Sequence, residues 1–196
     1  MASMTAEVSG RPTTQQSAAT PRWVALASLA LGATAAIAFA IIAVTMTLSN
    51  PTTKDLSFHH TGDYWYTGIG IPTAISVAAL LFALRALQPT ARPRLTLTGA
   101  TLNAVAVGVL AVMLAYSVVT GAEARWGGTY VVATLATFVA HALFVAGTWR
   151  SGLFPRPVLA VWPVVWLIGA FAAQGATPLL LAAFYGVLAT YVVRRA

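Results

Sequence analysis

The sequence of 196 residues contains no cysteine, a single lysine and four acidic residues, and only 8% of it is charged. The absence of cysteine excludes a disulfide framework, a thiolate nucleophile and a metal site with cysteine ligands. A soluble domain carries about 25% charged residues, so these few ionic groups would not cover a soluble globule. Disordered chains are poor in apolar residues, whereas 59% of this sequence is hydrophobic. The composition therefore indicates an integral membrane protein.

Long apolar runs divide the chain into membrane-spanning segments. A helix needs about 20 mostly apolar residues to cross the hydrocarbon core. Six segments meet or approach this length, at about 22–48, 67–87, 97–120, 129–149, 157–173 and 178–193. The last two are short, and short spans are accommodated by local thinning of the bilayer or by a tight turn just inside the interface. We therefore expect an all-α transmembrane domain over residues 22–196, a polytopic membrane protein with six helices in three hairpins.

The basic residues indicate an orientation. With six spans, one side of the membrane holds both termini, two short links and nine basic residues, and the other side holds Lys54 and Arg125. Cytoplasmic segments carry an excess of Lys and Arg, so both termini are expected in the cytoplasm of a cell-membrane protein. Residues 1–21 have the composition of a disordered cytoplasmic tail. The basic residues stand singly, which argues against nucleic acid as a partner.

The longest external segment, residues 49–66, carries the densest group of polar side chains. His60 and Asp63 lie in it, and Glu123 follows on the same side of the membrane. Imidazole and carboxylate groups act as general acids and bases, so these three are the candidate catalytic residues. Metal binding is disfavoured, because the adjacent His59 and His60 diverge and no further ligand follows at a suitable spacing. The favoured interpretation is a hydrated loop without chemistry.

Three aromatic residues, Tyr64, Trp65 and Tyr66, end the same external segment. Tyr and Trp gather at membrane interfaces, so they are expected to anchor the helix that follows. Their rings also present π faces that attract a cation. We therefore treat them as candidate ligand contacts as well as anchors.

His141 is the only ionisable side chain well inside an expected span. Asn103, on the preceding span, is expected at a comparable depth, and a hydrogen bond between the two would satisfy both side chains. This pair is either structural or part of a proton relay. Haem ligation by His141 together with His59 or His60 is excluded, because about 18 Å of membrane depth separates them. No cofactor is expected.

Small residues recur at every fourth position of the first span. They are Ser28, Gly32, Ala36 and Ala40. Such a ridge allows close approach of another helix. Packing within the chain is favoured over docking of a second subunit.

The motifs of the common enzyme classes are absent. The sequence contains no Gly-x-x-x-x-Gly-Lys loop, His-Glu-x-x-His helix or Gly-x-Ser-x-Gly elbow. This lack of a catalytic signature favours a non-enzymatic accessory, scaffold or immunity-type module. Its partners would be the lipid bilayer and another membrane subunit.

Two alternatives stay open. One is a component that binds or transports a small solute, since the chain resembles the substrate-binding subunits of energy-coupling-factor vitamin transporters in size and topology. The other is a membrane enzyme with a lipid-like or isoprenoid substrate at the extracytoplasmic face. In that case Asp63 or Glu123 would supply the acid, with His60 beside them.

Overall fold

The computed structural model describes residues 14–49, 55–88, 91–124, 126–171 and 175–195. The helices of these residues are α1 Thr14–Thr45, α2 Thr61–Gly68, α3 Gly70–Ala86, α4 Pro93–Thr120, α5 Thr129–Thr148, α6 Arg156–Ala170 and α7 Pro178–Arg195. Helices α2 and α3 meet at Ile69 and follow one another as a single segment, Thr61–Ala86. The regular secondary structure of the described part of the chain is therefore all helical, which confirms the all-α part of the expected fold class.

Five helical segments of the described chain are long and apolar enough to cross a membrane. They are Ala19–Thr45, Thr61–Ala86, Pro93–Thr120, Thr129–Thr148 and Pro178–Arg195. The remaining apolar helix, α6, has 15 residues and a length of about 22 Å, less than the roughly 30 Å of a hydrocarbon core. The chain is thus a multi-pass membrane protein.

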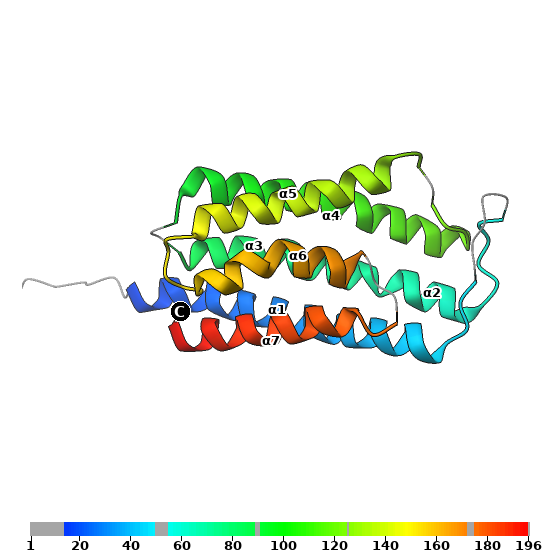
Figure 1. Cartoon of the computed structure of the whole chain (residues 1–196), viewed down its shortest axis with the longest axis horizontal. Helices are drawn as coiled ribbons and strands as arrows, with labels where there is room; N and C mark the ends of the chain where they lie inside the picture. Colours follow the sequence, from blue (N-terminus) through cyan, green and yellow to red (C-terminus); the bar gives the residue numbers. More distant parts are fainter. Residues whose placement is uncertain (1–13, 50–54, 89–90, 125, 172–174, 196) are drawn as a thin grey trace, which may run out of the picture.

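The helices lie in three layers that run along one common direction (Figure 1). Helices α1 and α7 form one layer, α4 and α5 form the opposite one, and α3 and α6 lie between them. Two glycines allow α4 and α5 to approach closely. A Cβ on Gly99 would lie 2.7 Å from the Ala140 carbonyl oxygen, and one on Gly147 would lie 2.7 Å from Thr96.

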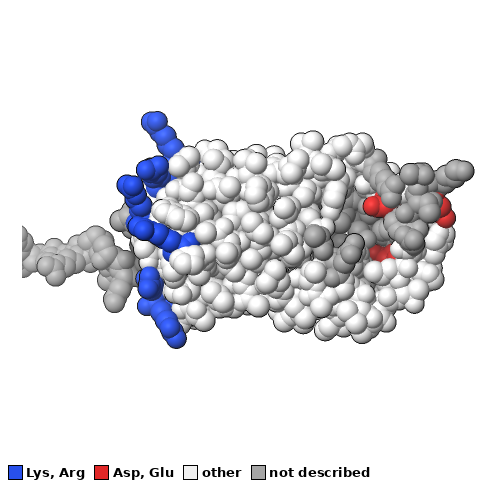
Figure 2. All heavy atoms as spheres, in the orientation of Figure 1, with Lys and Arg blue, Asp and Glu red and all other residues white. Residues whose placement is uncertain are grey.

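The charged side chains are separated between the two ends of the bundle (Figure 2). The described arginines lie at one end, where α1, α4 and α6 begin and α3, α5 and α7 finish; they are Arg22, Arg85, Arg92, Arg94, Arg150, Arg156, Arg194 and Arg195. We call this the basic end. The described acids, Asp55, Asp63 and Glu123, lie at the opposite end, the acidic end.

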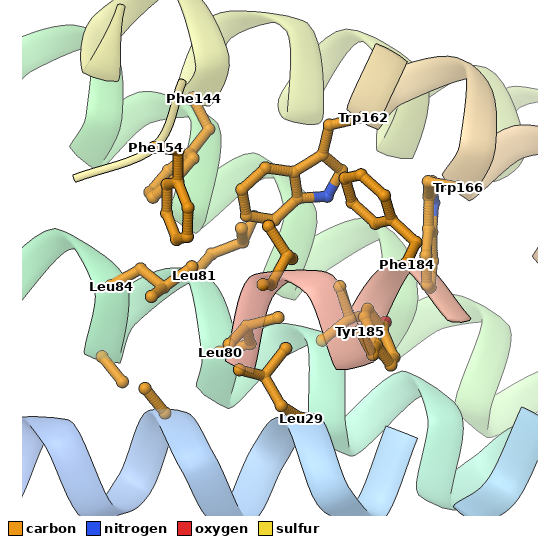
Figure 3. Packing of buried hydrophobic residues seen from close by; sticks show 14 of the residues in the cluster. Leu29, Leu80, Leu81, Leu84, Phe144, Phe154, Trp162, Trp166, Phe184 and Tyr185 are labelled. Atoms are coloured by element: carbon orange, nitrogen blue, oxygen red, sulfur yellow. The ribbon is translucent and has the colours of Figure 1, made fainter. Parts of the chain in front are cut away.

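An aromatic core fills the space between the layers (Figure 3). Trp162 of α6 stands at its centre and makes edge contacts with Phe144, Phe154 and Phe184, at centroid distances of 5.8–5.9 Å. Below it, Leu29 and Leu80 pack with Tyr185. Because lipid tails are as apolar as this core, close packing rather than burial from water holds such helices together.

The helix boundaries differ most from the expected spans at two places. α1 begins at Thr14, within the segment expected to be a disordered tail, because Gln and Ala are good helix formers and extend the helix ahead of Pro21. The second helical segment begins at Thr61 rather than 67. Asp63 accounts for the earlier start, because its carboxylate accepts backbone amides at the beginning of the helix.

Candidate functional site

A cavity of about 450 Å³ lies within the bundle toward the acidic end. Each of the helices α1 to α7 contributes at least one lining residue. Pockets that bind small molecules have volumes of about 300–1,000 Å³ and mostly apolar walls. This cavity is therefore the first candidate for a functional site in the described part of the chain.

Aromatic side chains form much of the cavity wall. Phe39 of α1 packs on Tyr66 of α2 with ring centroids 4.2 Å apart. Across the cavity, Phe171 contacts both Trp166 and Tyr130 edge-on, at 5.9 and 6.2 Å. Rings in such arrangements hold one another in place. The wall thus offers fixed apolar faces and edges to a ligand.

The polar groups of the cavity are few. Glu123 and Tyr130 are exposed at its wall. Ser117 is already engaged, because its hydroxyl donates to the Met113 carbonyl and accepts the Ala124 amide, both at 2.9 Å. A small number of polar groups on an otherwise apolar wall is typical of sites that orient an amphipathic molecule.

Two loop segments cross the acidic end of the bundle and contribute to the same cavity. Ser57 and Ala122 form an antiparallel bridge. On either side of it, Phe58 donates its amide to the Gly121 carbonyl at 2.7 Å and Glu123 donates its amide to the Leu56 carbonyl at 2.8 Å. Phe58 and Glu123 are therefore held at the cavity by backbone hydrogen bonds between the two loops.

Asp63, a candidate catalytic residue, does not line this cavity. Its side chain is buried, and its two oxygens accept four hydrogen bonds. The donors are the amide and the hydroxyl of Ser49 and the amides of His59 and His60, at 2.7–3.1 Å. A carboxylate with this many donors is held as an anion that fixes the chain around it. The arrangement suits a structural clamp better than an acid that releases protons.

His60 and Glu123, the other catalytic candidates, lie in different surroundings. His60 is exposed and precedes α2 as its N-cap, whereas Glu123 is at the cavity. The neighbouring His59 pairs with Asp55 at 2.9 Å. The hydrogen bond from the Ser57 amide lowers the pKa of the Asp55 carboxyl below its usual value, and the hydrogen bond with His59 lowers it further. Within the described ranges, no three His, Cys, Asp or Glu side chains are grouped as a metal site.

The three aromatic residues expected as ligand contacts have three different positions. Tyr66 lines the cavity. Tyr64 packs edge-on against Phe58 at 5.0 Å and so supports the crossing loop. Trp65 is 59% exposed on the outside of the bundle. Their separation follows from the helix, in which consecutive residues point about 100° apart.

The expected hydrogen bond between His141 and Asn103 is absent, which corrects the sequence-based pairing. Both side chains are fully buried, yet neither Asn103 amide atom nor Nε2 of His141 has a hydrogen-bond partner in the described structure. The Nδ1 atom of His141 donates to the Thr137 carbonyl at 2.8 Å. Its ring stacks on Trp166 at 4.9 Å and is thereby turned toward α6.

The ridge on α1 faces the other helices of the chain. Ser28, Gly32, Ala36 and Ala40 are buried, and α1 packs on α3 and α7. At Gly32 an added Cβ would overlap the Tyr185 ring of α7 and lie 2.9 Å from the Ser76 hydroxyl of α3. Ala36 also lines the cavity.

Several cavity residues were not singled out from the sequence. They are Phe39, Tyr130, Trp166 and Phe171. They come from three separate segments, α1, α5 and α6 with its C-cap, and only the folded bundle brings them together. The available signal was their shared position in the acidic-end half of their spans, which is too common among aromatic residues to indicate a site.

Comparisons with known proteins give no relative for this chain. No protein-family model matches it, and no curated protein and no solved structure matches it.

Proposed function

We propose that this protein binds a small, largely apolar molecule in the cavity at the acidic end of its bundle. The observation that carries the proposal is the cavity of about 450 Å³ with six aromatic residues in its wall. This proposal corresponds to the small-solute binding component that the sequence leaves open as an alternative, with a lipid-like molecule as the ligand. The apolar body of the ligand would lie between the aromatic rings.

The polar end of such a ligand would lie beside Glu123. A carboxylate is an acceptor of hydrogen bonds and attracts a cation, so a hydroxyl or an amine is the favoured polar group. Tyr130 adds a phenol that both donates and accepts. The ligand class is therefore an amphipathic alcohol or amine with a compact apolar body.

The two other functions raised by the sequence have less support. An extracytoplasmic enzyme loses one of its two candidate acids, because the Asp63 carboxylate already accepts four hydrogen bonds, which leaves Glu123 at the cavity wall. An accessory or immunity-type module would need a docking face, but the ridge around Gly32 is covered by Tyr185 and Ser76 of the same chain. Both stay secondary proposals.

We further propose six spans, with both termini in the cytoplasm of a cell membrane. The collection of arginines at one end supports this orientation, because basic residues are retained on the cytoplasmic side. α6 would act as the sixth span. Its 15 residues would require a locally thinner bilayer or burial among the other helices.

The function is tested by thermal unfolding of the purified protein in detergent. The panel should contain farnesol, long-chain alkylamines and long-chain fatty acids, which share apolar bodies and differ in their polar ends. A ligand at a hundred times its dissociation constant stabilises the folded state by about 2.7 kcal/mol. We expect an alcohol or amine to raise the melting temperature more than a fatty acid does. Equal or no stabilisation by all of them would contradict the proposal.

A further inference from the structure

A second cavity, of about 630 Å³, opens at the basic end of the bundle between α5 and α6. Small residues create it. Ala142 and Ala146 lie one turn apart on α5, and Ala160 and Pro163 lie one turn apart on α6, so each pair shares a helix face. Their short side chains leave an apolar groove between the two helices. The groove shares no lining residue with the cavity at the acidic end.

Two arginines stand at this groove. Arg92 precedes α4, and its backbone amide donates to the Gly147 carbonyl near the end of α5 at 2.9 Å, which fixes Arg92 beside that helix. Arg150 follows α5 directly. Both side chains are exposed, so their guanidinium groups can reach a ligand from opposite chain segments.

Nothing anionic in the described structure neutralises these two arginines. Asp55, Asp63 and Glu123 all lie at the opposite end of the bundle (Figure 2). The guanidinium groups of Arg92 and Arg150 have no partner among the described residues, in contrast to Arg22 and Arg195, which donate to backbone carbonyls. Among the described residues no acidic side chain lies near these two arginines, so they are available to an anionic ligand.

The groove also has the depth expected for a lipid chain. Trp149, an aromatic residue suited to the membrane interface, lies at the same end of the groove as the arginines. From Trp149 to Ala142 the α5 helix extends about 10 Å into the hydrocarbon region. Pro163 lies at a similar depth, seven residues into α6 from Arg156. An apolar channel thus leads from an interfacial positive charge toward the membrane interior.

We propose that this groove binds an anionic phospholipid, with its phosphate between Arg92 and Arg150 and one acyl chain along α5 and α6. Guanidinium groups pair with phosphate oxygens through two parallel hydrogen bonds. Basic pockets between transmembrane helices bind anionic head groups in this way. A zwitterionic lipid carries a compensating positive charge and binds less well. The site is independent of the ligand proposed for the cavity at the acidic end.

The test is native mass spectrometry of the full-length protein released from nanodiscs made of equal parts phosphatidylglycerol and phosphatidylcholine. Wild-type protein is expected to retain phosphatidylglycerol selectively. In the double variant Arg92→Gln/Arg150→Gln, the preference for phosphatidylglycerol over phosphatidylcholine should fall by about thirtyfold. Each basic side chain near an anionic surface contributes about fivefold, and two are removed. The matched control, Arg94→Gln/Arg194→Gln, removes the same charge at the same end outside the groove and should retain it.

A second variant keeps every charge and tests the apolar part of the site. Ala160→Phe fills the groove from an exposed position on α6 and should also reduce phosphatidylglycerol retention. In a separate arm, inorganic phosphate should fail to displace the bound lipid. The proposal is overturned if wild-type protein shows no preference between the two lipids. It is equally overturned if the control pair loses as much as the groove pair, or if inorganic phosphate displaces the lipid.

Discussion

The carboxylate of Asp63 accepts hydrogen bonds from both the backbone amide and the hydroxyl of Ser49, each 2.7 Å long. This contact joins the segment after α1 to the first turn of α2. The same carboxylate holds the amides of His59 and His60, so one side chain joins Ser49 to the residues just before α2. Asp63, a catalytic candidate of the sequence, thus ties the segment after α1 to the start of α2 in the fold.

Replacing this anchor should destabilise the protein. Asp63→Ala leaves the amides of Ser49, His59 and His60 without their acceptor, and we expect a loss of about 2–4 kcal/mol, because unsatisfied donors keep their desolvation cost. Thermal unfolding in detergent measures the change. Asp55→Ala, at an exposed carboxylate of the same loop, serves as the control and should lower the melting temperature much less, because water replaces its hydrogen bonds with Ser57 and His59. Equal melting temperatures for the two variants would contradict the anchoring role.

Two helical glycines should respond in opposite directions to the same substitution. Gly32→Ala forces a methyl group into the buried Tyr185 ring, and we expect destabilisation by about 1–3 kcal/mol. Gly108→Ala meets no atom within 4 Å, and we expect stabilisation by about 0.5–1 kcal/mol from the better helix propensity. Thermal unfolding of the matched pair checks both signs. A stabilised Gly32→Ala variant would mean that α1 does not pack on α7 at this point.

His141 should tolerate phenylalanine but not alanine. Its Nε2 atom has no hydrogen-bond partner in the described structure, so His141→Phe removes an unsatisfied polar atom and keeps the stack on Trp166. His141→Ala leaves a void and should cost about 2–4 kcal/mol. Both values are read from unfolding curves. A phenylalanine variant as unstable as the alanine variant would show that the imidazole nitrogens, rather than the ring packing, hold this position.

The lack of native cysteine makes the orientation directly measurable. Ser57→Cys at the acidic end should react with a membrane-impermeant maleimide in intact cells. Arg94→Cys at the basic end should react only after the cells are permeabilised, because that end is proposed to be cytoplasmic. Both positions are exposed, and the wild-type chain supplies the unlabelled background. The reverse labelling pattern would invert the proposed topology.

The sequence predicts the helices well because hydropathy and the lengths of apolar runs depend on local composition. Hydropathy does not predict where α1 and α2 begin, because helix propensity sets the start of α1 and the Asp63 carboxylate sets the start of α2. α6 shows the limit of a rule based on length, since its 15 residues pack around the buried Trp162 and Trp166 although the helix is short.

The candidate site is less predictable because it depends on contacts between distant segments. Glu123 and Tyr66 are recognisable in the sequence as polar or aromatic residues near one membrane face, and both line the cavity. Asp63 shares that face but is engaged by Ser49, 14 residues away. For Asn103 and His141, similar depth is not enough for a hydrogen bond, because the stack on Trp166 turns the imidazole toward α6.

The most direct test of the cavity as a ligand site compares two variants with the same chemistry. Ala74→Phe places a ring in the cavity wall, whereas Ala115→Phe places one on an exposed face of α4 that does not line it. The measurement is the rise in melting temperature that the best alcohol or amine of the panel produces in each variant, relative to the variant without ligand. We expect this rise to persist in Ala115→Phe and to be lost in Ala74→Phe. An undiminished rise in a folded Ala74→Phe variant would contradict ligand binding in this cavity.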